Sequence, residues 1–232
     1  MTPHRPVVAM LMFPDFTHLD LVGPHAAWGA DMDIELVWKD LDPVATDTGM
    51  RIVPTSTFTT CPEQIDILFV PGGFGTARAA AEPGVLRFLA DRGRHARYVT
   101  SVCTGSILLG AAGLLDGYRA GTHWAFREFL AQFGAECVTD RVVIDRNRIT
   151  GGGVTAGIDF GLTVLAEVFG DEKAQAIQLM LEYDPAPPFD SGTPEKANPA
   201  VRSAIESLLA DGKSDWQLAL DEALTLRSSN SA

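Results

Sequence analysis

One residue of the sequence, Cys103, has surroundings that indicate nucleophilic chemistry. Residues 98–102 before it have strand character, residues 104–106 after it are small, and residues 107–115 are rich in Ala and Leu, as in a helix. A sharp turn from strand to helix holds the residue at the turn at the carboxyl edge of a sheet and directs the N–H groups of the helix N-terminus toward it. We therefore predict an accessible Cys103 thiol that is biased towards thiolate and acts as a catalytic nucleophile.

The competing interpretation of Cys103 is a buried cysteine that packs as a small hydrophobic side chain. The strand–Cys-Thr-Gly-Ser–helix context favours the functional interpretation. Cys61 and Cys137 lie in no such turn, and we expect structural roles for both. Because the three cysteines form no CxxC pair and are odd in number, the sequence predicts neither a disulfide framework nor a zinc site.

Three residues are candidates for moving the proton that a thiol reaction requires. Asp20 lies among apolar residues beyond the first predicted strand. It is either a helix N-terminal acid that interacts with backbone N–H groups or a general acid near the thiol. Asp15, in a Pro-Asp turn, is a weaker candidate. His123 is either a base for Cys103 or a structural hydrogen-bonding residue, and Thr104 stands where a thiol activated by an adjacent imidazole would have histidine.

Two glycine-rich turns also follow predicted strands. The N–H groups of the turn at Gly72 and Gly73, together with that of Thr104, are expected to form an anion-stabilising hole near the cysteine. The three glycines at 151–153 resemble a phosphate-binding loop, but the Walker lysine and the GxGxxG spacing are absent, so we expect no nucleotide binding.

These turns require a particular arrangement of strands and helices around them. Strands alternate with helices along most of the chain, which predicts an α/β fold with a mostly parallel central sheet flanked by helices on both faces. In such a sheet, turns at the carboxyl ends of strands converge on one edge; here they are residues 14–20, 71–75, 103–105 and 151–153. Predicted strands cover residues 7–13, 34–38, 51–57, 65–70, 98–102, 137–138, 142–145 and 148–150, and predicted helices cover residues 17–30, 83–95, 107–115, 125–133, 155–169 and 172–181.

The chain changes character near its C-terminus. We expect residues 1–182 to form the α/β domain that carries the nucleophile turn. Residues 184–194 are a proline-rich extended connector, followed by two predicted helices, 199–210 and 216–226, and a polar tail. We expect residues 183–232 to form a helical arm that packs on the same domain or on a dimer partner.

Composition limits the classes of function. The sequence is 46% hydrophobic and 21% charged, as in an ordinary soluble globular protein. A net charge of −12 argues against nucleic acid as a partner, because phosphate binding needs clustered Lys and Arg. No apolar run approaches the roughly 20 residues that span a bilayer, and the first residues lack the features of a signal peptide. We therefore expect a cytoplasmic protein without membrane association.

Six segments carry a resemblance to a known family: LDLVGPH at 19–25, PGG at 71–73, SVCTGS at 101–106, THW at 122–124, GGGVTAGIDF at 151–160 and QLMLEYDPAPPF at 178–189. Together they resemble the isonitrile (isocyanide) hydratases of the ThiJ/PfpI superfamily along nearly the whole chain. Hydrolytic members of the superfamily place His directly after the cysteine, so Thr104 favours a hydratase. Val154 stands where the family usually has isoleucine, which is a mild change.

The resemblance implies a class I glutamine amidotransferase-like, flavodoxin-like sandwich and a homodimer. It implies that Cys103 is the nucleophile, Asp20 the acid/base carboxylate and Thr104 the neighbouring polar residue. It also implies that the backbone of three residues in glycine-rich turns faces the substrate: Gly73, Gly152 and Val154. The implied reaction adds water to an isocyanide to give an N-substituted formamide through a thioimidate on the cysteine. It needs no metal and no organic cofactor.

Two alternatives stay open. One is another cysteine enzyme of the same superfamily, of glyoxalase, deglycase or amidase type. The other is a ligand sensor without catalysis, as in the N-terminal half of AraC-type regulators; against it, the residues after the connector are too few for a paired helix-turn-helix module and carry little positive charge. Phe74, Trp124 and Ile158 are candidates for the apolar walls of a pocket.

Overall fold

A seven-stranded sheet forms the centre of the protein, which we describe from a computed structural model over residues 4–230, with side chains as far as residue 227. Residues 1–3 of the predicted α/β domain and residues 231–232 of the predicted polar tail lie outside the described residues. The strand order is β10-β11-β7-β6-β1-β2-β5, and every neighbouring pair is parallel except β10–β11. The strands are β1 (Val7–Leu11), β2 (Asp33–Trp38), β5 (Ser56–Thr57), β6 (Ile67–Val70), β7 (Tyr98–Ser101), β10 (Val142–Asp145) and β11 (Arg148–Gly151). The predicted α/β fold with a mostly parallel sheet is confirmed.

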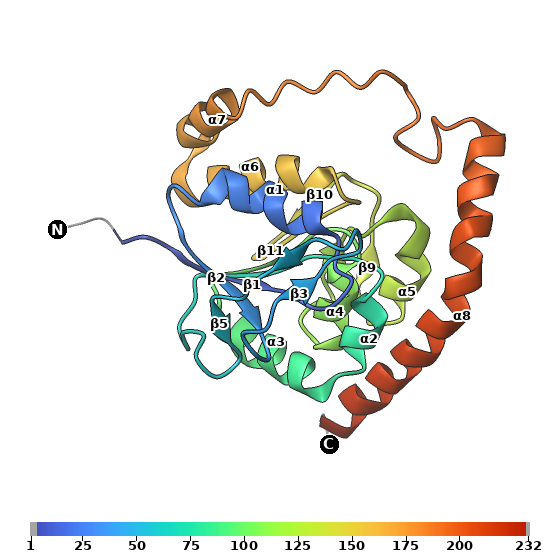
Figure 1. Ribbon diagram of the computed structural model, residues 1–232, viewed down its shortest axis with the longest axis horizontal. Helices are drawn as coiled ribbons and strands as arrows, with labels where there is room; N and C mark the ends of the chain where they lie inside the picture. Colours follow the sequence, from blue (N-terminus) through green and yellow to red (C-terminus); the bar gives the residue numbers. More distant parts are fainter. Residues whose placement is uncertain (1–3, 231–232) are drawn as a thin grey trace.

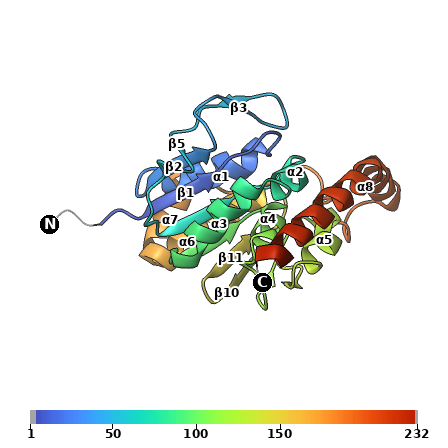
Figure 2. The ribbon, with the colours of Figure 1, turned by 90° about the horizontal axis from the view of Figure 1, so that it is seen from below.

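Helices cover both faces of this sheet (Figures 1 and 2). One face carries α1 (His18–Trp28), α6 (Ala156–Phe169) and α7 (Asp171–Met180), and the other carries α2 (Thr76–Ala80), α3 (Pro83–His95), α4 (Gly105–Ala111) and α5 (Arg127–Ala131). The short helix α2 was not predicted, although its sequence Thr-Ala-Arg-Ala-Ala is rich in the strongest helix-forming residue. A single-turn 3₁₀ helix, η1 (Trp124–Phe126), precedes α5, and a small two-stranded sheet pairs β8 (Arg119–Ala120) with β9 (Glu136–Cys137).

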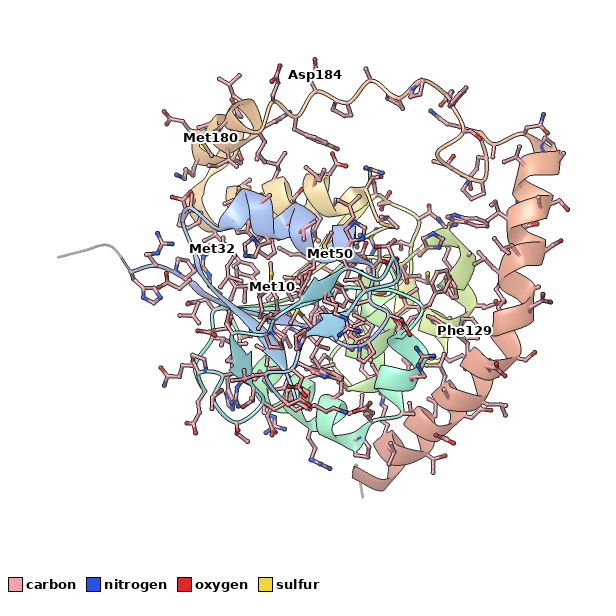
Figure 3. The ribbon with its side chains drawn as sticks, viewed as in Figure 1. Met10, Met32, Met50, Phe129, Met180 and Asp184 are labelled. Carbon is pink, nitrogen blue, oxygen red and sulfur yellow. The ribbon has the colours of Figure 1, made fainter. Side chains whose placement is uncertain are left out.

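The core holds α1 in place over the sheet. The side chains of β1 and β6 are almost entirely buried, and Met10 lies at the centre of the molecule (Figure 3). The Trp28 ring lies 5.6 Å from the Phe69 ring and 5.7 Å from the Phe160 ring, and its Nε1 donates to the Gly161 carbonyl oxygen at 2.9 Å. Aromatic pairs of this kind contribute about 1 kcal/mol each beyond their buried area. These contacts join α1 to β6 and α6, and so fix the helix that carries Asp20.

The predicted strand at 51–57 is divided in the structure. β4 (Arg51–Ile52) pairs with β3 (Val44–Ala45) in a small antiparallel sheet, and β5 joins the edge of the central sheet instead. Pro54 lies between the two pieces, and because proline has no N–H it cannot donate to a strand ladder. Pairing resumes at once after it, where the Thr55 N–H donates to the Leu36 carbonyl oxygen at 2.8 Å.

The prediction of two C-terminal helices is wrong, because residues 199–230 form one continuous helix, α8 (Pro199–Asn230). It follows an extended connector that arches from α7 to α8, and it runs along the side of the molecule (Figure 1). Gly212 costs about 1 kcal/mol in a helix interior. The burial of Trp216, Leu220 and Ala223 against the domain offsets that cost. α8 spans 32 residues but is largely polar, and no helix within residues 4–230 is both long and apolar enough to cross a membrane.

Candidate active site

Cys103 occupies a strained turn between β7 and α4. Its φ is +53°, in the left-handed region that residues with a side chain rarely adopt. The turn can form only because glycines surround it: a Cβ at Gly72 would lie 2.4 Å from the Thr104 nitrogen, and one at Gly105 would lie 2.2 Å from the Val70 carbonyl oxygen. The Cys103 N–H donates to the carbonyl oxygen of Gly152 at 2.9 Å, which ties the turn to the end of β11.

Asp20, from α1, is fully buried beside this cysteine. Its Oδ2 accepts a hydrogen bond from the Gly72 N–H at 2.8 Å. Its Oδ1 is also buried and, among residues 4–227, accepts no hydrogen bond. Burial raises the pKa of the carboxyl group from 3.8 to about 7, against the lowering effect of the Gly72 N–H and the Cys103 thiol, and the charge of Asp47 raises it slightly more. Asp20 can therefore hold or release a proton near neutral pH.

The Cys103 thiol differs from the sequence-based prediction in its exposure and in its pKa. Cys103 is only 5% exposed, and its pKa lies well above the ordinary value because of burial and the adjacent Asp20 carboxylate. The backbone N–H groups of Val154 and Thr104 interact with the sulfur and lower its pKa, but by less. The prediction of an accessible residue biased towards thiolate is therefore wrong for the resting site. The sulfur is buried, and the Asp20 carboxyl group is the titratable group beside it.

Thr104 links the cysteine turn to the turn after β6. Its Oγ1 accepts a hydrogen bond from the Gly73 N–H at 3.0 Å and lies 2.8 Å from the hydroxyl oxygen of Thr76, at the start of α2. The N–H groups of both Gly72 and Gly73 are thus occupied by side chains of the site itself. They do not form the expected anion-stabilising hole; the N–H groups that reach the sulfur belong to Thr104 and Val154.

We expect Thr104→Val to destabilise the protein by about 3 kcal/mol, because it leaves the buried Gly73 N–H and the Thr76 hydroxyl without this partner. Thr104→Ser keeps the oxygen and removes only a methyl group, at about 1 kcal/mol. Urea denaturation of the two variants beside the wild type measures the difference. Equal midpoints for the valine and serine variants would contradict this role of the hydroxyl.

His123 is placed as a structural residue. Its Nδ1 accepts a hydrogen bond from the Ala125 N–H at 3.3 Å and so caps η1. Burial, together with the nearby positive charge of Arg127, lowers its pKa to about 4, so the ring is neutral at physiological pH. The ring lies in the wall of the cavity above Cys103.

Cys103 opens onto a cavity of about 450 Å³ with a largely apolar lining. Of the residues predicted to face substrate, Gly73 and Val154 line it, whereas Gly152 lies behind Cys103 and contributes the carbonyl oxygen that holds the cysteine N–H. Of the predicted apolar walls, Phe74 and Trp124 line the cavity. Ile158 does not; it lies against Gly23 of α1.

Two groups of cavity residues were not predicted from the sequence. The first is polar and consists of Thr17, His18, Asp47 and Thr48; His18 Nδ1 lies 3.5 Å from an Asp47 carboxylate oxygen and 3.3 Å from the Thr48 hydroxyl. The second is a pair of apolar residues from α8, Ile205 and Leu209. Thr17 and His18 belong to the turn at residues 14–20, which was predicted to approach the site, but no role was assigned to either. Nothing in the local sequence around Asp47 and Thr48 or in α8 indicates a site. Both reach the cavity only because the chain folds back over the ends of the strands.

The arrangement suits addition of the thiol to a small unsaturated carbon electrophile. Asp20 can take the proton from the sulfur and return it to the carbon that the sulfur attacks, and the apolar cavity can hold the remainder of the substrate. Within residues 4–230, no three His, Cys, Asp or Glu side chains come together in a way that would hold a metal ion.

Comparison with known proteins adds independent information. Residues 6–167 match the model of the DJ-1/PfpI family. The chain is 52% identical to an isonitrile hydratase of Pseudomonas putida over 196 residues, which cover 84% of this chain and 86% of that protein. A crystal structure of a ThiJ/PfpI family protein from Pseudomonas syringae superposes with a TM-score of 0.89 at 50% identity and covers 97% of this chain and 91% of that one. An HTH-type transcriptional regulator of Pseudomonas aeruginosa is 36% identical over 138 residues, which are 59% of this chain and 37% of the regulator.

Proposed function

Because the chain belongs to the DJ-1/PfpI family and is similar to an isonitrile hydratase along most of its length, we propose that it adds water to an isocyanide to give an N-substituted formamide. The observation that carries the proposal is the buried pair of Cys103 and Asp20 at the base of an apolar cavity. A thiol with a proton-carrying group beside it can add across R–N≡C, and the apolar lining of the cavity can hold an apolar substituent.

The first step forms a carbon–sulfur bond. Ionised Asp20 takes the thiol proton, the Cys103 sulfur attacks the terminal isocyanide carbon, and Asp20 then donates that proton to the same carbon. The product of this step is a neutral thioimidate, R–N=CH–S–Cys103, and Asp20 is ionised again. The raised pKa of Asp20 suits both directions of transfer, because a general acid–base group works best when its pKa is near the working pH.

The second step hydrolyses the intermediate. Ionised Asp20 takes a proton from water as the oxygen attacks the thioimidate carbon, and Asp20 passes that proton to the nitrogen. The carbon–sulfur bond then breaks as Asp20 moves the hydroxyl proton of this intermediate to the sulfur, and R–NH–CHO leaves with the thiol restored. Water is consumed and no other reactant is needed. The N–H groups of Val154 and Thr104 stabilise the sulfur as it gains negative charge on leaving.

Detection of the product tests this proposal directly. Incubation of the protein with an alkyl isocyanide is expected to produce a formamide, whose formyl proton is resolved by NMR. Glyoxal, supplied in a parallel reaction, is the substrate that the glyoxalase alternative predicts to be consumed. Consumption of glyoxal without formation of formamide would replace the hydratase proposal with that alternative.

The ligand-sensor alternative has less support than the hydratase proposal. An AraC-type regulator requires paired helix-turn-helix units after the sensing domain. Residues 199–230 instead form a single helix that packs along the α/β domain. The similarity to the Pseudomonas aeruginosa regulator covers 59% of this chain and 37% of that protein, whereas the similarity to the isonitrile hydratase covers 84% and 86%.

We also propose that the protein acts as a homodimer in the cytoplasm. Four large apolar side chains on α6, α7 and the connector are exposed: Phe169, Leu179, Met180 and Phe189. Met180 lies at the outer edge of the molecule (Figure 3). An exposed apolar surface of this kind is typical of a self-association face. Light scattering is expected to give about twice the chain mass of 24.9 kDa, and a monomer mass would contradict the dimer. The three free cysteines are consistent with a reducing compartment.

A further inference from the structure

The C-terminal helix α8 contributes to the cavity wall above Cys103, although it belongs to the part of the chain that follows the connector. We propose that Ile205 and Leu209 of α8 contact the N-substituent of the isocyanide and determine which substituents the site accepts. This inference rests on the proposed function and identifies the residues that select among its substrates.

A single face of α8 carries both the residues that attach the helix to the domain, which we call the anchor (Trp216, Leu220 and Ala223), and the residues that line the cavity. Ile205, Leu209, Trp216, Leu220 and Ala223 follow one another at intervals of three, four or seven residues, which places them on the same side of a helix. The last three are buried against the domain, and the first two line the cavity. The anchored half therefore fixes the direction in which the other half presents its apolar side chains.

The anchor is held by ring contacts and hydrogen bonds. The Trp216 ring lies 4.5 Å from the Phe126 ring and 5.8 Å from the Phe129 ring, and Phe129 lies beside α8 in Figure 3. The Arg227 guanidinium donates to the carbonyl oxygens of Gly110 and Phe133. Phe126 also lines the cavity, so the surface that anchors the helix continues into the cavity wall.

The other half of the helix has little packing of its own. Every residue from 201 to 208 is exposed, and Ile205 retains 41% of its surface although it lines the cavity. Leu208, next to Leu209 on a different face, is 73% exposed. Ile205 is not part of the packed core, and Leu209 is only partly buried against it. Their remaining apolar surface is available to an apolar group inside the cavity.

The shape of an isocyanide directs its substituent toward this wall. The R–N≡C unit is linear, so with the terminal carbon at the Cys103 sulfur the substituent extends away from the cysteine and into the cavity. One group of lining residues is polar, Thr17, His18, Asp47 and Thr48, and comes from the start of α1 and the loop before β4. The apolar group comes from η1 and α8 and also includes Leu19, Phe74 and Val154. An apolar substituent buries its surface favourably only against the second group.

Substrates of different size separate this role from a structural one. We expect Leu209→Ala and Ile205→Ala each to lower kcat/KM for benzyl isocyanide by roughly 10-fold, and to change kcat/KM for methyl isocyanide by less than about 2-fold, because methyl does not reach the wall. The loss for the benzyl substrate should appear in KM more than in kcat. Leu209→Trp, which fills the cavity, is expected to exclude benzyl isocyanide and retain methyl isocyanide. Leu208→Ala and Leu218→Ala, on exposed faces of the same helix, are the matched controls and should leave both substrates unchanged.

The outcomes distinguish the inference from the function on which it rests. Equal losses for both substrates in the Leu209 variants, or no change for either, would overturn the assignment of α8 as a selecting wall while the wild type still produces formamide. If the wild type produces no formamide from either substrate, the proposed function itself fails. Far-ultraviolet circular dichroism of each variant verifies that the helix is retained, and Leu209→Trp provides a second test should an alanine variant fail to fold.

Discussion

Replacement of Cys103 by alanine is expected to abolish formamide production, with kcat reduced by roughly 10⁶-fold, the order found when a covalent nucleophile is removed. In the proposed mechanism the sulfur is the atom that bonds to the substrate, and among residues 4–227 the cavity contains no other thiol, because the remaining cysteines lie outside its lining. General acid–base catalysis by Asp20 alone cannot replace a covalent intermediate. The measurement is the initial rate of formyl-proton appearance by NMR at saturating isocyanide.

Cys137→Ala is the matched control for this variant, because Cys137 is a half-buried thiol on β9, away from the cavity. It is expected to retain wild-type turnover. Mass spectrometry of the wild type quenched during turnover is expected to show one adduct with the mass of the isocyanide, located on the peptide that contains Cys103. Formamide production by the Cys103→Ala protein would contradict the covalent mechanism.

Replacement of Asp20 by asparagine is expected to lower kcat by roughly 10²- to 10⁴-fold, the usual contribution of a positioned acid–base group. Asparagine keeps the shape of the side chain and can still accept the Gly72 N–H through its carbonyl oxygen. It cannot accept the proton of the buried thiol. Because the pKa of that thiol lies well above its ordinary value, the sulfur then stays protonated and unreactive at neutral pH.

The pH dependence follows from the same pair of groups. The reactive form has an ionised Asp20 and a protonated thiol, so it is lost when Asp20 becomes protonated. Since the pKa of Asp20 is about 7, kcat/KM of the wild type is expected to fall about 10-fold for each pH unit below 7 and to level off above it. In Asp20→Asn this limb should disappear from the residual activity. A wild-type profile that is flat from pH 5 to pH 8 would contradict the assignment of Asp20 as the base.

Stability measurements show whether the activity lost in Asp20→Asn reflects chemistry or folding. The folded-state pKa of Asp20 lies above its unfolded value, so the folded state binds the proton more tightly, and stability is lost as pH rises from about 4 to about 7. At pH 8 the ionised carboxylate costs on the order of 4 kcal/mol, which asparagine avoids. The variant should therefore be more stable than the wild type at pH 8 and similar to it at pH 4. An inactive variant that is also unstable at pH 8 would undermine the catalytic interpretation.

Local sequence was sufficient to predict the fold class and the turn that carries Cys103, the proposed nucleophile. Strand and helix periods are set by residues that are neighbours along the chain, and so is the sharp turn at Cys103, where small residues follow a strand. Parallel strands then place their turns at one edge, so the approach of Asp20 and the residue 72–73 turn to Cys103 could be predicted without coordinates. The motifs of the family assigned a role to each of these residues.

The protonation of the site and the full wall of the cavity depend on contacts between distant parts of the chain. The pKa of a thiol or carboxyl group depends on how much water surrounding elements remove, and α1 and α6 reach the site from distant parts of the chain. For that reason the predicted thiolate became a buried thiol, and Asp20 acquired a pKa of about 7. The N–H groups after β6 likewise found partners in Asp20 and Thr104 that local sequence does not indicate.

The continuity of the C-terminal helix also could not be predicted from local sequence. Gly212 interrupts the local helical preference, and the sequence therefore indicated two helices. The burial of Trp216 and Leu220 against the domain outweighs that preference and yields one helix. Its continuity carries Ile205 and Leu209 to the cavity above Cys103. Packing against residues far along the chain sets this outcome, and local propensity contains no information about it.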